Sequence, residues 1–236
     1  MNYYVIDAFN LTLIAAAGAI NSKQDLPLED KLYNILSHML NSLRSKFSNG
    51  KWYAVWDTYG GTQFRKEIDE NYKSNRSNSL IDFKEILACK STYEFYDIEN
   101  IEVPNSEADD IIFVLCKNLK EKHIQSNITI ISRDKDLIQV VQAGYASNQY
   151  DPVKKENIKI PAYSVVDYKA LVGDSSDVIK GVPGIGSKTA IKVLTGFYPL
   201  TGEQKEIFEK CKDMIDATRH PRFQENYSFV KQLIKE

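Results

Sequence analysis

The chain has 236 residues, of which 43% are apolar and 26% are charged, and its formal net charge is −2. This composition is typical of one large globular domain, or of a domain with a small appendage, and it excludes a disordered chain. Its cysteines, Cys89, Cys116 and Cys211, are odd in number and widely spaced. Their spacing indicates a reduced, intracellular protein without a zinc site.

The apolar stretch at residues 11–20 is the one candidate for a targeting or membrane segment. It has no basic leader, and Asp7 lies inside the strand-like run that precedes it. These features exclude a signal peptide and a membrane span. We therefore expect a cytoplasmic protein that does not contact a membrane.

Three short apolar runs, at residues 3–6, 52–56 and 128–131, predict buried strands, and residues 28–47 have the periodicity of a helix that stops before Gly50. Strands that alternate with helices favour a parallel sheet covered on both faces. The expected fold class is therefore α/β, with a central, mainly parallel sheet flanked by helices.

Each of the three predicted strands is followed by aspartates: Asp7 after the first, Asp57 after the second, and Asp134 with Asp136 after the third. In open α/β sheets, binding sites lie outside the carboxyl ends of the strands. One such aspartate is a common turn residue. Aspartates after all three strands predict an acidic site at one edge of the sheet.

The stretch at residues 105–112 predicts the start of a helix with three carboxylates. Ser106 and Asp109 have the spacing of a capping box, and Glu107 and Asp110 would lie on one helix face. Acids in a first turn also complement the helix dipole, so a solvated helix start is the alternative to a metal site. The strand-end aspartates favour the metal site, because grouped buried carboxylates need cations.

The segment between Gly60 and Lys90 is basic. On a helix, Arg65, Tyr72 and Arg76 would share one face, with Lys73 beside them. Such a face suits a phosphate backbone with a base stacked on the tyrosine, and a solvated helix face is the alternative. The glycines before it and the polar residues 74–79 indicate a mobile segment over the sheet edge.

Residues 165–172 predict a helix, and residues 180–190 predict a glycine-rich hairpin followed by a second helix. Gly184 and Gly186 permit the turn, and Ser187 can begin the helix, with Lys188 next. Amides at such a helix start favour a phosphate, so this is a helix-hairpin-helix grip on a DNA backbone. The spacing does not fit a nucleotide-binding P-loop. Helices are also expected at 202–217 and 223–235, and the histidines are taken as structural.

The overall charge also permits a nucleic-acid partner. Nine acids are implicated by these segments and by Asp174 and Asp177, which precede the hairpin. Removing nine negative charges from a net charge of −2 leaves +7 on the rest of the chain. A basic surface can therefore surround an acidic site.

Together these motifs resemble the flap endonuclease superfamily of 5′-nucleases, especially small free-standing bacteriophage and bacterial enzymes similar to the 5′→3′ exonuclease domain of DNA polymerase I. The resemblance extends from Tyr3 to about Leu194. It implies a PIN-like catalytic domain at 1–160, with a helical arch at about 58–90, and a helix-hairpin-helix region with a helical C-terminus at 161–236. The matching motifs are Val5-Ile6-Asp7-Ala8-Phe9-Asn10, Val55-Trp56-Asp57, Tyr72-Lys73-x-x-Arg76, Glu107-Ala108-Asp109-Asp110, Asp134-Lys135-Asp136, Gly173-Asp174-x-x-Asp177 and Gly181-Val182-Pro183-Gly184-Ile185-Gly186.

The resemblance implies two metal clusters that hold two or more Mg²⁺ or Mn²⁺ ions. The tighter cluster would contain Asp7, Asp57, Glu107 and Asp109, with Asp110 beside them, and the second would contain Asp134, Asp136, Asp174 and Asp177. It also implies that Lys73 acts in catalysis with Asp7, Asp57 and Asp109. Arg76 would grip a phosphate, and backbone carbonyls near Val182 and Ile185 would bind K⁺.

The implied activity is cleavage of DNA near 5′ ends, flaps or gaps in replication and repair, extending to RNA–DNA hybrids at primers, by a monomer. Two alternatives stay open. One is a structure-specific DNA-binding protein whose acids are vestigial, and the other is a PIN-type ribonuclease. The hairpin at 180–190 argues against the ribonuclease, because PIN-type ribonucleases are shorter and lack it.

Overall fold

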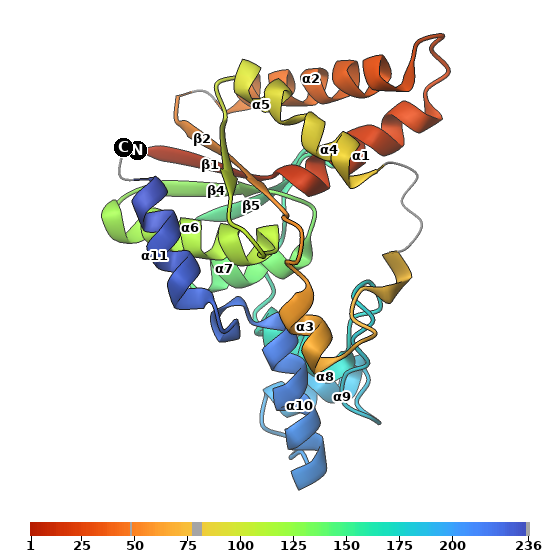
Figure 1. Cartoon of the computed structure of the whole chain (residues 1–236). Coiled ribbons are helices and arrows are strands. Elements are labelled where there is room, and N and C mark those ends of the chain that lie inside the picture. Colours follow the sequence, from red (N-terminus) through yellow and green to blue (C-terminus); the bar gives the residue numbers. More distant parts are fainter. Residues whose placement is uncertain (48, 77–81, 235–236) are drawn as a thin grey trace.

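A six-stranded sheet forms the centre of the computed structural model, which describes residues 1–47, 49–76 and 82–234. Its strand order is β3-β2-β1-β4-β5-β6 (Figure 1). The first five of these are parallel, and β6 pairs with β5 in the antiparallel direction. The strands are β1 (Asn2–Asp7), β2 (Lys51–Trp56), β3 (Glu99–Glu102), β4 (Asn127–Ile131), β5 (Asn148–Asp151) and β6 (Glu156–Asn157).

The predicted α/β class is confirmed, and the three predicted strands are β1, β2 and β4. Sequence analysis missed β3, β5 and β6 because they lack an apolar run. β3 reads Glu-Asn-Ile-Glu and buries only Ile101. β5 reads Asn-Gln-Tyr-Asp, and its polar Gln149 is fully buried with its amide donating to Ser132 and Asp134 carbonyls.

Helices cover both faces of the sheet (Figure 1). On one face lie α1 (Ala8–Asn21), α2 (Leu28–Lys46), α4 (Phe83–Ala88) and α5 (Lys90–Phe95). On the other lie α6 (Ala108–Lys122), α7 (Ile138–Gln142) and α11 (Phe223–Leu233). Each face has its own apolar core, which fixes the sheet between them.

The apolar stretch near the N-terminus is α1. Its buried positions Leu11, Ala15 and Ala19 recur every four residues and pack in the same core as Leu36 and Leu40 of α2. None of the helices in the described ranges combines the length and apolar character needed to cross a membrane.

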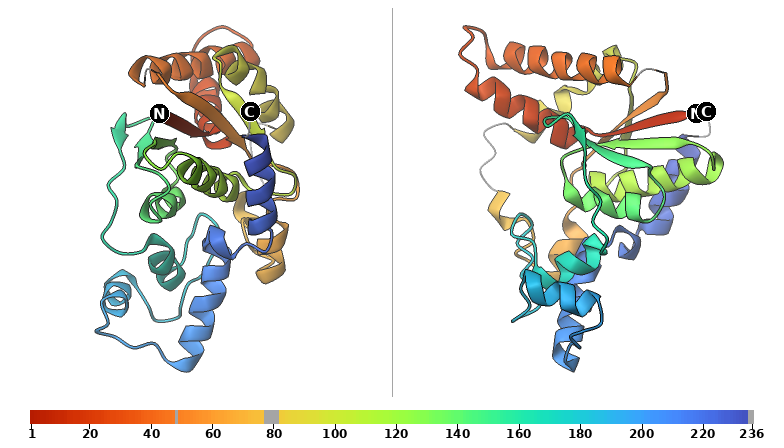
Figure 2. Two further views of the ribbon diagram at one scale, coloured as in Figure 1. Left: turned by 90° about the vertical axis from the view of Figure 1, so that its left-hand side faces the viewer. Right: turned by 180° about the vertical axis from the view of Figure 1, so that it is seen from behind.

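The C-terminal part contains α8 (Val165–Val172), α9 (Ser187–Leu194), α10 (Gly202–Ile215) and a 3₁₀ turn, η3 (Ala217–Arg219). Figure 2 shows α8, α9 and α10 projecting away from the sheet, and α11 returning beside it. A small core of Leu171, Val182, Ile185 and Ala190 holds α8 and α9 together. Helix α11 is held against α6, where the side-chain amide of Asn118 donates to the Tyr227 carbonyl. The domain division near residue 160 stays a prediction.

The predicted arch contains short pieces: α3 (Gln63–Ile68), a 3₁₀ turn η1 (Ser74–Arg76), and α4. The prediction that Arg65, Tyr72 and Arg76 share one helix face is wrong, because α3 ends at Ile68 and Asp69 is extended. The chain then turns inward and buries Tyr72. Residues 77–81 of the predicted mobile segment lie outside the described residues.

Candidate metal centre and nucleic-acid interface

Asp7 and Asp57 lie at the carboxyl edge of the sheet, as predicted. Asp7 ends β1 and is 4% exposed, and its carboxylate accepts hydrogen bonds from the Asn10 amide (3.0 Å) and the Ser132 hydroxyl (2.9 Å). Asp57 follows β2 and accepts from the Ala108 amide (2.9 Å). Both side chains are therefore oriented by the helix starts next to them.

The predicted capping box at Ser106 and Asp109 is wrong. The N-cap of α6 is Glu107, whose side chain makes no capping bond, and Asp57 from the adjacent strand end caps the helix instead. Ser106 is buried and its hydroxyl bonds to the Pro104 carbonyl and the Asn226 amide. A cap supplied by another segment leaves no local sequence signal.

Glu107, the N-cap of α6, and Asp110 in its first turn lie on the same side of the helix start, as predicted, but both bond to a buried cation. Arg65 donates to Glu107 at 2.7 Å and to both oxygens of Asp110 at 2.8 Å. Its Nε also donates to the Met214 carbonyl at 2.7 Å, and Arg65 is 4% exposed. We call Arg65, Glu107 and Asp110 the buried ion-pair network.

This network corrects two predictions. Arg65 does not present its guanidinium on a surface for nucleic acid, because every bond described above points into the protein. Asp110 is 2% exposed and bidentate with Arg65, so it is an internal partner of that cation and not a candidate metal ligand.

Lys73 enters the site beside this network. Its ammonium pairs with Glu107, and its backbone amide donates to the Asp177 carbonyl at 3.1 Å. Burial opposes the charge on Glu107, but Lys73 and Arg65 lower the pKa of its carboxyl to about 2. Glu107 is therefore an anion at any physiological pH, and it holds Lys73 at the acidic edge.

Tyr72 lies inside the protein and not on a base-binding surface, which corrects another prediction. It is 3% exposed, packs with Ile138 and Met214, and donates its hydroxyl to Glu107 at 3.3 Å. Its ring also lies near the Lys73 ammonium, 5.0 Å from the ring centre. Tyr72 therefore supports the position of Lys73. Of Arg76, only the backbone at the end of η1 is described.

Asp7, Asp57, Asp109 and Asp134 act on one another electrostatically, and we call them the strand-end group. Burial, with the charges of Asp57 and Asp134, raises the pKa of Asp7 to about 7. Burial, with the charges of Asp134 and Asp7, raises the pKa of Asp109 well above its usual range. Asp134, expected in the second cluster, therefore also faces the first. Grouped carboxylates of this kind bind a divalent cation in place of protons.

Asp136, Asp174 and Asp177 form a second acid group. Each offers a carboxylate oxygen, and these oxygens lie within 4.8 Å of one another. Lys169 of α8 pairs with both Asp136 and Asp174. Burial, with the charge of Asp134, raises the pKa of Asp136 to about 7 although Lys169 opposes this shift.

The turn that carries Asp174 depends on glycine. Gly173 ends α8 with φ +85°, and a Cβ there would come within 2.5 Å of the Ile179 carbonyl oxygen. Asp174 and Ile179 exchange backbone hydrogen bonds of 2.7 and 2.8 Å. This backbone bridge brings Asp174 beside Lys169 at the end of the helix.

The ligand chemistry of both groups is that of hard divalent ions. Both groups offer only carboxylate oxygens, the ligands that Mg²⁺ and Mn²⁺ prefer. A groove of about 670 Å³ lies beside them, lined by Asp134 and Asp174 and by basic and aromatic side chains. These are Arg133, Lys135, Lys159, Tyr163, Tyr168 and Lys169.

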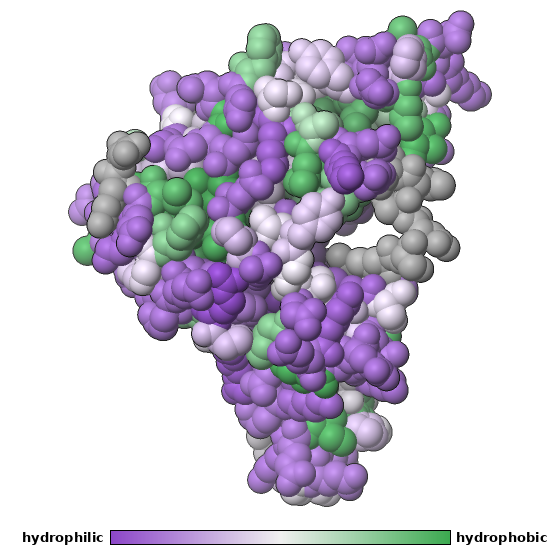
Figure 3. All heavy atoms as spheres, viewed as in Figure 1, coloured by the Kyte–Doolittle hydropathy of each residue, from purple (hydrophilic) through white to green (hydrophobic). Residues whose placement is uncertain are grey.

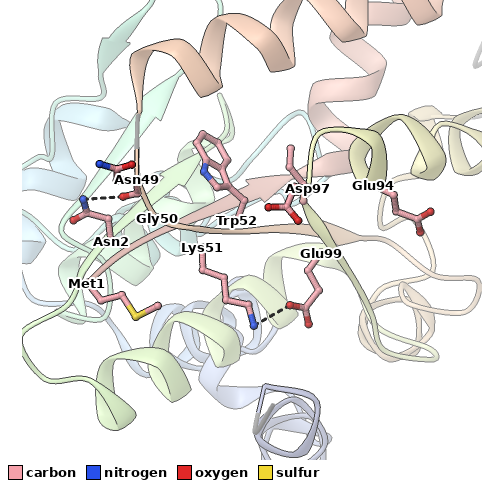
Figure 4. A pocket seen from close by; sticks show the side chains of 10 residues that line it. Met1, Asn2, Asn49, Gly50, Lys51, Trp52, Glu94, Asp97 and Glu99 are labelled. Atoms are coloured by element: carbon pink, nitrogen blue, oxygen red, sulfur yellow. Dashed lines mark hydrogen bonds and ion pairs between the residues drawn. The ribbon is translucent and has the colours of Figure 1, made fainter.

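A larger cavity, of about 900 Å³, lies at the opposite edge of the sheet, where β1, β2 and β3 begin (Figure 4). It is lined by Asn2, Trp52 and Asp97, and by Lys51 and Glu99, which form an ion pair of 3.0 Å. Sites in parallel sheets lie at the carboxyl ends of the strands. We therefore assign the chemistry to the acidic edge and not to the larger cavity.

The glycine-rich hairpin has the predicted form. Gly184 turns with φ +79°, the Ile185 amide donates to the Val182 carbonyl at 3.1 Å, and α9 begins at Ser187. Val182 and Ile185 are buried, whereas Gly184, Gly186, Ser187 and Lys188 are exposed. The N-cap Gly186 provides no side-chain cap, so the start of α9 faces outward as a phosphate site requires. Hydrophilic side chains also predominate over nearby α3 and α10 (Figure 3).

Comparison with protein families identifies two matching regions. Residues 2–168 match the family described as 5′-3′ exonuclease, N-terminal resolvase-like domain, and residues 160–234 match 5′-3′ exonuclease, C-terminal SAM fold. The chain belongs to the 5′-3′ exonuclease family. The second match extends beyond Leu194, where the sequence resemblance was expected to end, so α10 and α11 belong to the family fold as well.

Relatives of the exonuclease family include DNA polymerase I of Lactococcus lactis, which is 31% identical over 83% of this chain and 23% of its own length. The 5′-3′ exonucleases of Mycoplasmopsis pulmonis and Buchnera aphidicola are 32% and 34% identical over 70% and 75% of this chain. The chain matches 55% and 63% of the lengths of these two relatives. It therefore spans less than two thirds of all three.

Solved structures confirm the PIN-like fold. The bacteriophage T5 D15 protein, co-crystallized with metal ions, superposes with a TM-score of 0.70 at 16% identity over the whole of both chains. A complex of the T5 D15 flap endonuclease with DNA and metal ions gives 0.69 at 18% identity over the same coverage.

Sequence reasoning missed Lys169 and Ser132, which contact the acids directly. Lys169 lies five residues before Asp174, in the last turn of a helix that ends at glycine. That spacing was a usable signal for a lysine near the second acid group. Ser132 follows β4 and bonds to Asp7 on the neighbouring strand, so only the strand order reveals it.

Proposed function

We propose that this protein is a metal-dependent, structure-specific 5′-nuclease that cleaves DNA near 5′ ends, flaps or gaps, as flap endonuclease and 5′→3′ exonuclease. The observation that carries the proposal is the arrangement of two oxygen-only acid groups at one sheet edge with Lys73 held between them by Glu107 and the Asp177 carbonyl. Membership of the 5′-3′ exonuclease family across residues 2–234 supports it.

The strand-end group, with Glu107, would hold one Mg²⁺ or Mn²⁺, and the second acid group would hold another. Bound ions of this kind supply an activated water and stabilise the charge that develops on a phosphodiester. Hydrogen bonds orient two of the carboxylates that would hold the ion. Asp7 accepts from the Asn10 amide and the Ser132 hydroxyl, and Asp57 accepts from the Ala108 amide. The Lys73 ammonium adds a fixed positive charge at the same edge, where the transition state gains negative charge.

The hairpin would hold the duplex by its backbone. The exposed start of α9, at Gly186, Ser187 and Lys188, suits a phosphate, and Gly184 allows close approach. K⁺ bound through the carbonyls of Val182 and Ile185 would strengthen this grip. We also propose that Arg76 contacts the strand from the arch, that RNA–DNA hybrids at primers are substrates, and that the protein acts as a monomer.

A single-turnover cleavage assay tests this proposal. The substrate is a 5′-flap duplex labelled at its 5′ end, compared with the same duplex without a flap and with an RNA-primed flap, in Mg²⁺, Mn²⁺ or EDTA. We expect a short labelled product that requires both the flap and the divalent ion. Tight binding without cleavage in either ion would instead establish a DNA-binding protein. Cleavage restricted to single-stranded RNA would establish a PIN-type ribonuclease.

A further inference from the structure

Lys169 occupies an unusual position for a lysine. It lies in the last turn of α8, and its ammonium pairs with Asp136 and with Asp174, which come from two different segments. The side chain of Lys169 is 21% exposed, and those of Asp136 and Asp174 are 14% and 9% exposed. The contact is thus mostly shielded from water but remains open on the groove, which Lys169 also lines.

The ion pairs of Lys169 reduce the repulsion between the carboxylates of the second acid group. Three carboxylates whose oxygens lie within 4.8 Å of one another repel strongly when they are shielded from water. Lys169 supplies the opposite charge and so holds the group together. It does so by taking the oxygens of two of the three acids that a divalent ion would need.

We propose that Lys169 is a built-in counter-ion of the second acid group, which a divalent ion must displace from Asp136 and Asp174 in order to bind. The inference rests on the metal-binding part of the proposed function. Displacement is feasible because lysine is a single point charge on a flexible four-carbon stem, and the groove gives it space to withdraw. Lys169 therefore limits the metal affinity of this group, and it keeps the acids assembled before the ion arrives.

Two opposite effects of removing this charge follow from the proposal. Lys169→Met keeps most of the aliphatic stem but removes the ammonium. The metal-free protein should become less stable, because the shielded carboxylates of Asp136 and Asp174 lose their partner. The ion should bind more tightly, because the Lys169 ammonium no longer occupies the two oxygens and one positive charge beside the ion is removed.

The test is calorimetric titration of Mn²⁺ into metal-free protein without DNA, together with melting temperatures in EDTA and in saturating Mn²⁺. We expect Lys169→Met to bind Mn²⁺ at the second group at least about tenfold more tightly than the unaltered protein. Its melting temperature should fall in EDTA and gain more on adding Mn²⁺. Lys169→Gln repeats the test should the methionine variant fold poorly.

Control variants assign the effect to the proposed contact. Lys169→Arg keeps the charge and should not tighten binding. Lys135→Met removes an exposed lysine from the rim of the same groove and should leave the affinity nearly unchanged. Adding Asp177→Asn to Lys169→Met should abolish the gain, because it removes a carboxylate of the second group.

The outcomes separate this inference from the proposed function. Unchanged or weaker Mn²⁺ binding by Lys169→Met and Lys169→Gln, or an equal gain in Lys135→Met, would overturn the counter-ion role while the metal-dependent function stands. Mn²⁺ binding by Lys169→Met in excess of the unaltered protein supports it. No Mn²⁺ binding by any variant would overturn both.

Discussion

The buried ion-pair network and the second acid group both compensate carboxylates with a basic side chain, but they do so differently. Arg65 is enclosed and makes bonds to Glu107, Asp110 and the Met214 carbonyl. Lys169 faces a groove and pairs with Asp136 and Asp174 alone among its described ion pairs. A planar guanidinium in a closed site is a fixed structural charge, whereas an ammonium at a groove is one that can be exchanged.

The acidic edge is therefore not uniform in how its charges are compensated. Beside the arginine, Asp110 is bound through both oxygens and is part of the architecture, not a candidate metal ligand. Where the lysine is, the acids remain available to a metal ion. Single substitutions in each region should therefore have different effects. They should lower cleavage in the second acid group and lower stability in the buried ion-pair network.

The largest expected effect is on catalysis in the second acid group. Asp174→Asn preserves shape but removes a charge from the three-carboxylate group, so cleavage should fall by a hundredfold or more while DNA binding persists. Single-turnover cleavage and fluorescence anisotropy with the flap duplex measure the two properties. Glu99→Gln, at the opposite sheet edge, is the matched control. Full activity of Asp174→Asn would reject the assignment of this group.

In the buried ion-pair network the effect should fall on stability instead. Arg65→Met leaves Asp110 shielded from water without its bidentate partner and removes one of the two cations that pair with Glu107, which should lower the free energy of unfolding by about 3–5 kcal/mol. Lys51→Ala breaks an exposed pair with Glu99 and should cost less than about 1 kcal/mol. Urea denaturation compares them. Equal losses in the two variants would contradict an architectural role for Arg65.

Lys73 shares features of both regions. Its ammonium is held by Glu107 of the buried ion-pair network, but it lies at the acidic edge of the sheet. Lys73→Ala should slow single-turnover cleavage at saturating DNA by roughly tenfold or more, because it removes the positive charge that we propose stabilises the transition state. Lys84→Ala, an exposed lysine of α4, serves as the control. An unchanged chemical rate in Lys73→Ala, with weaker DNA binding alone, would make Lys73 a binding residue.

The smallest effect concerns pH and the metal-free protein. The pKa values of Asp7 and Asp136 are raised to about 7 in the folded protein, against about 4 in the unfolded chain. Between about pH 4 and pH 7 the folded state therefore binds more protons than the unfolded state. Stability should therefore decline as pH rises from 5 to 8 in EDTA, and saturating Mn²⁺ should restore more of it at pH 8 than at pH 5.

Differential scanning calorimetry at several pH values measures this decline. His220, whose pKa is lowered by burial, changes stability in the opposite direction, so the informative comparison is with Asp7→Asn. That variant should show a shallower decline than the unaltered protein. A melting temperature that rises from pH 5 to pH 8 in both proteins would contradict the proposed coupling of the acids.

The acidic edge was predictable because β1, β2 and β4 each have an apolar run that an aspartate ends or closely follows, a pattern contained in a few consecutive residues. The arch was not. Periodicity from Arg65 to Arg76 favoured one exposed helix, but Glu107 and Asp110, some forty residues later in the chain, draw Arg65 inward. Tyr72 is also buried, and its hydroxyl donates to Glu107. Long-range ion pairs of this kind leave no mark on local sequence.

The bond from Arg65 to the Met214 carbonyl has a consequence for anyone who shortens this protein. Met214 lies near the end of α10, which looks dispensable because it carries none of the acids. Deleting the chain after α9 would remove the acceptor for the Arg65 Nε and open a buried guanidinium to water next to Glu107. A shortened form of this protein must therefore retain α10, because its Met214 carbonyl closes the protein behind Arg65 and the Glu107 that Arg65 holds.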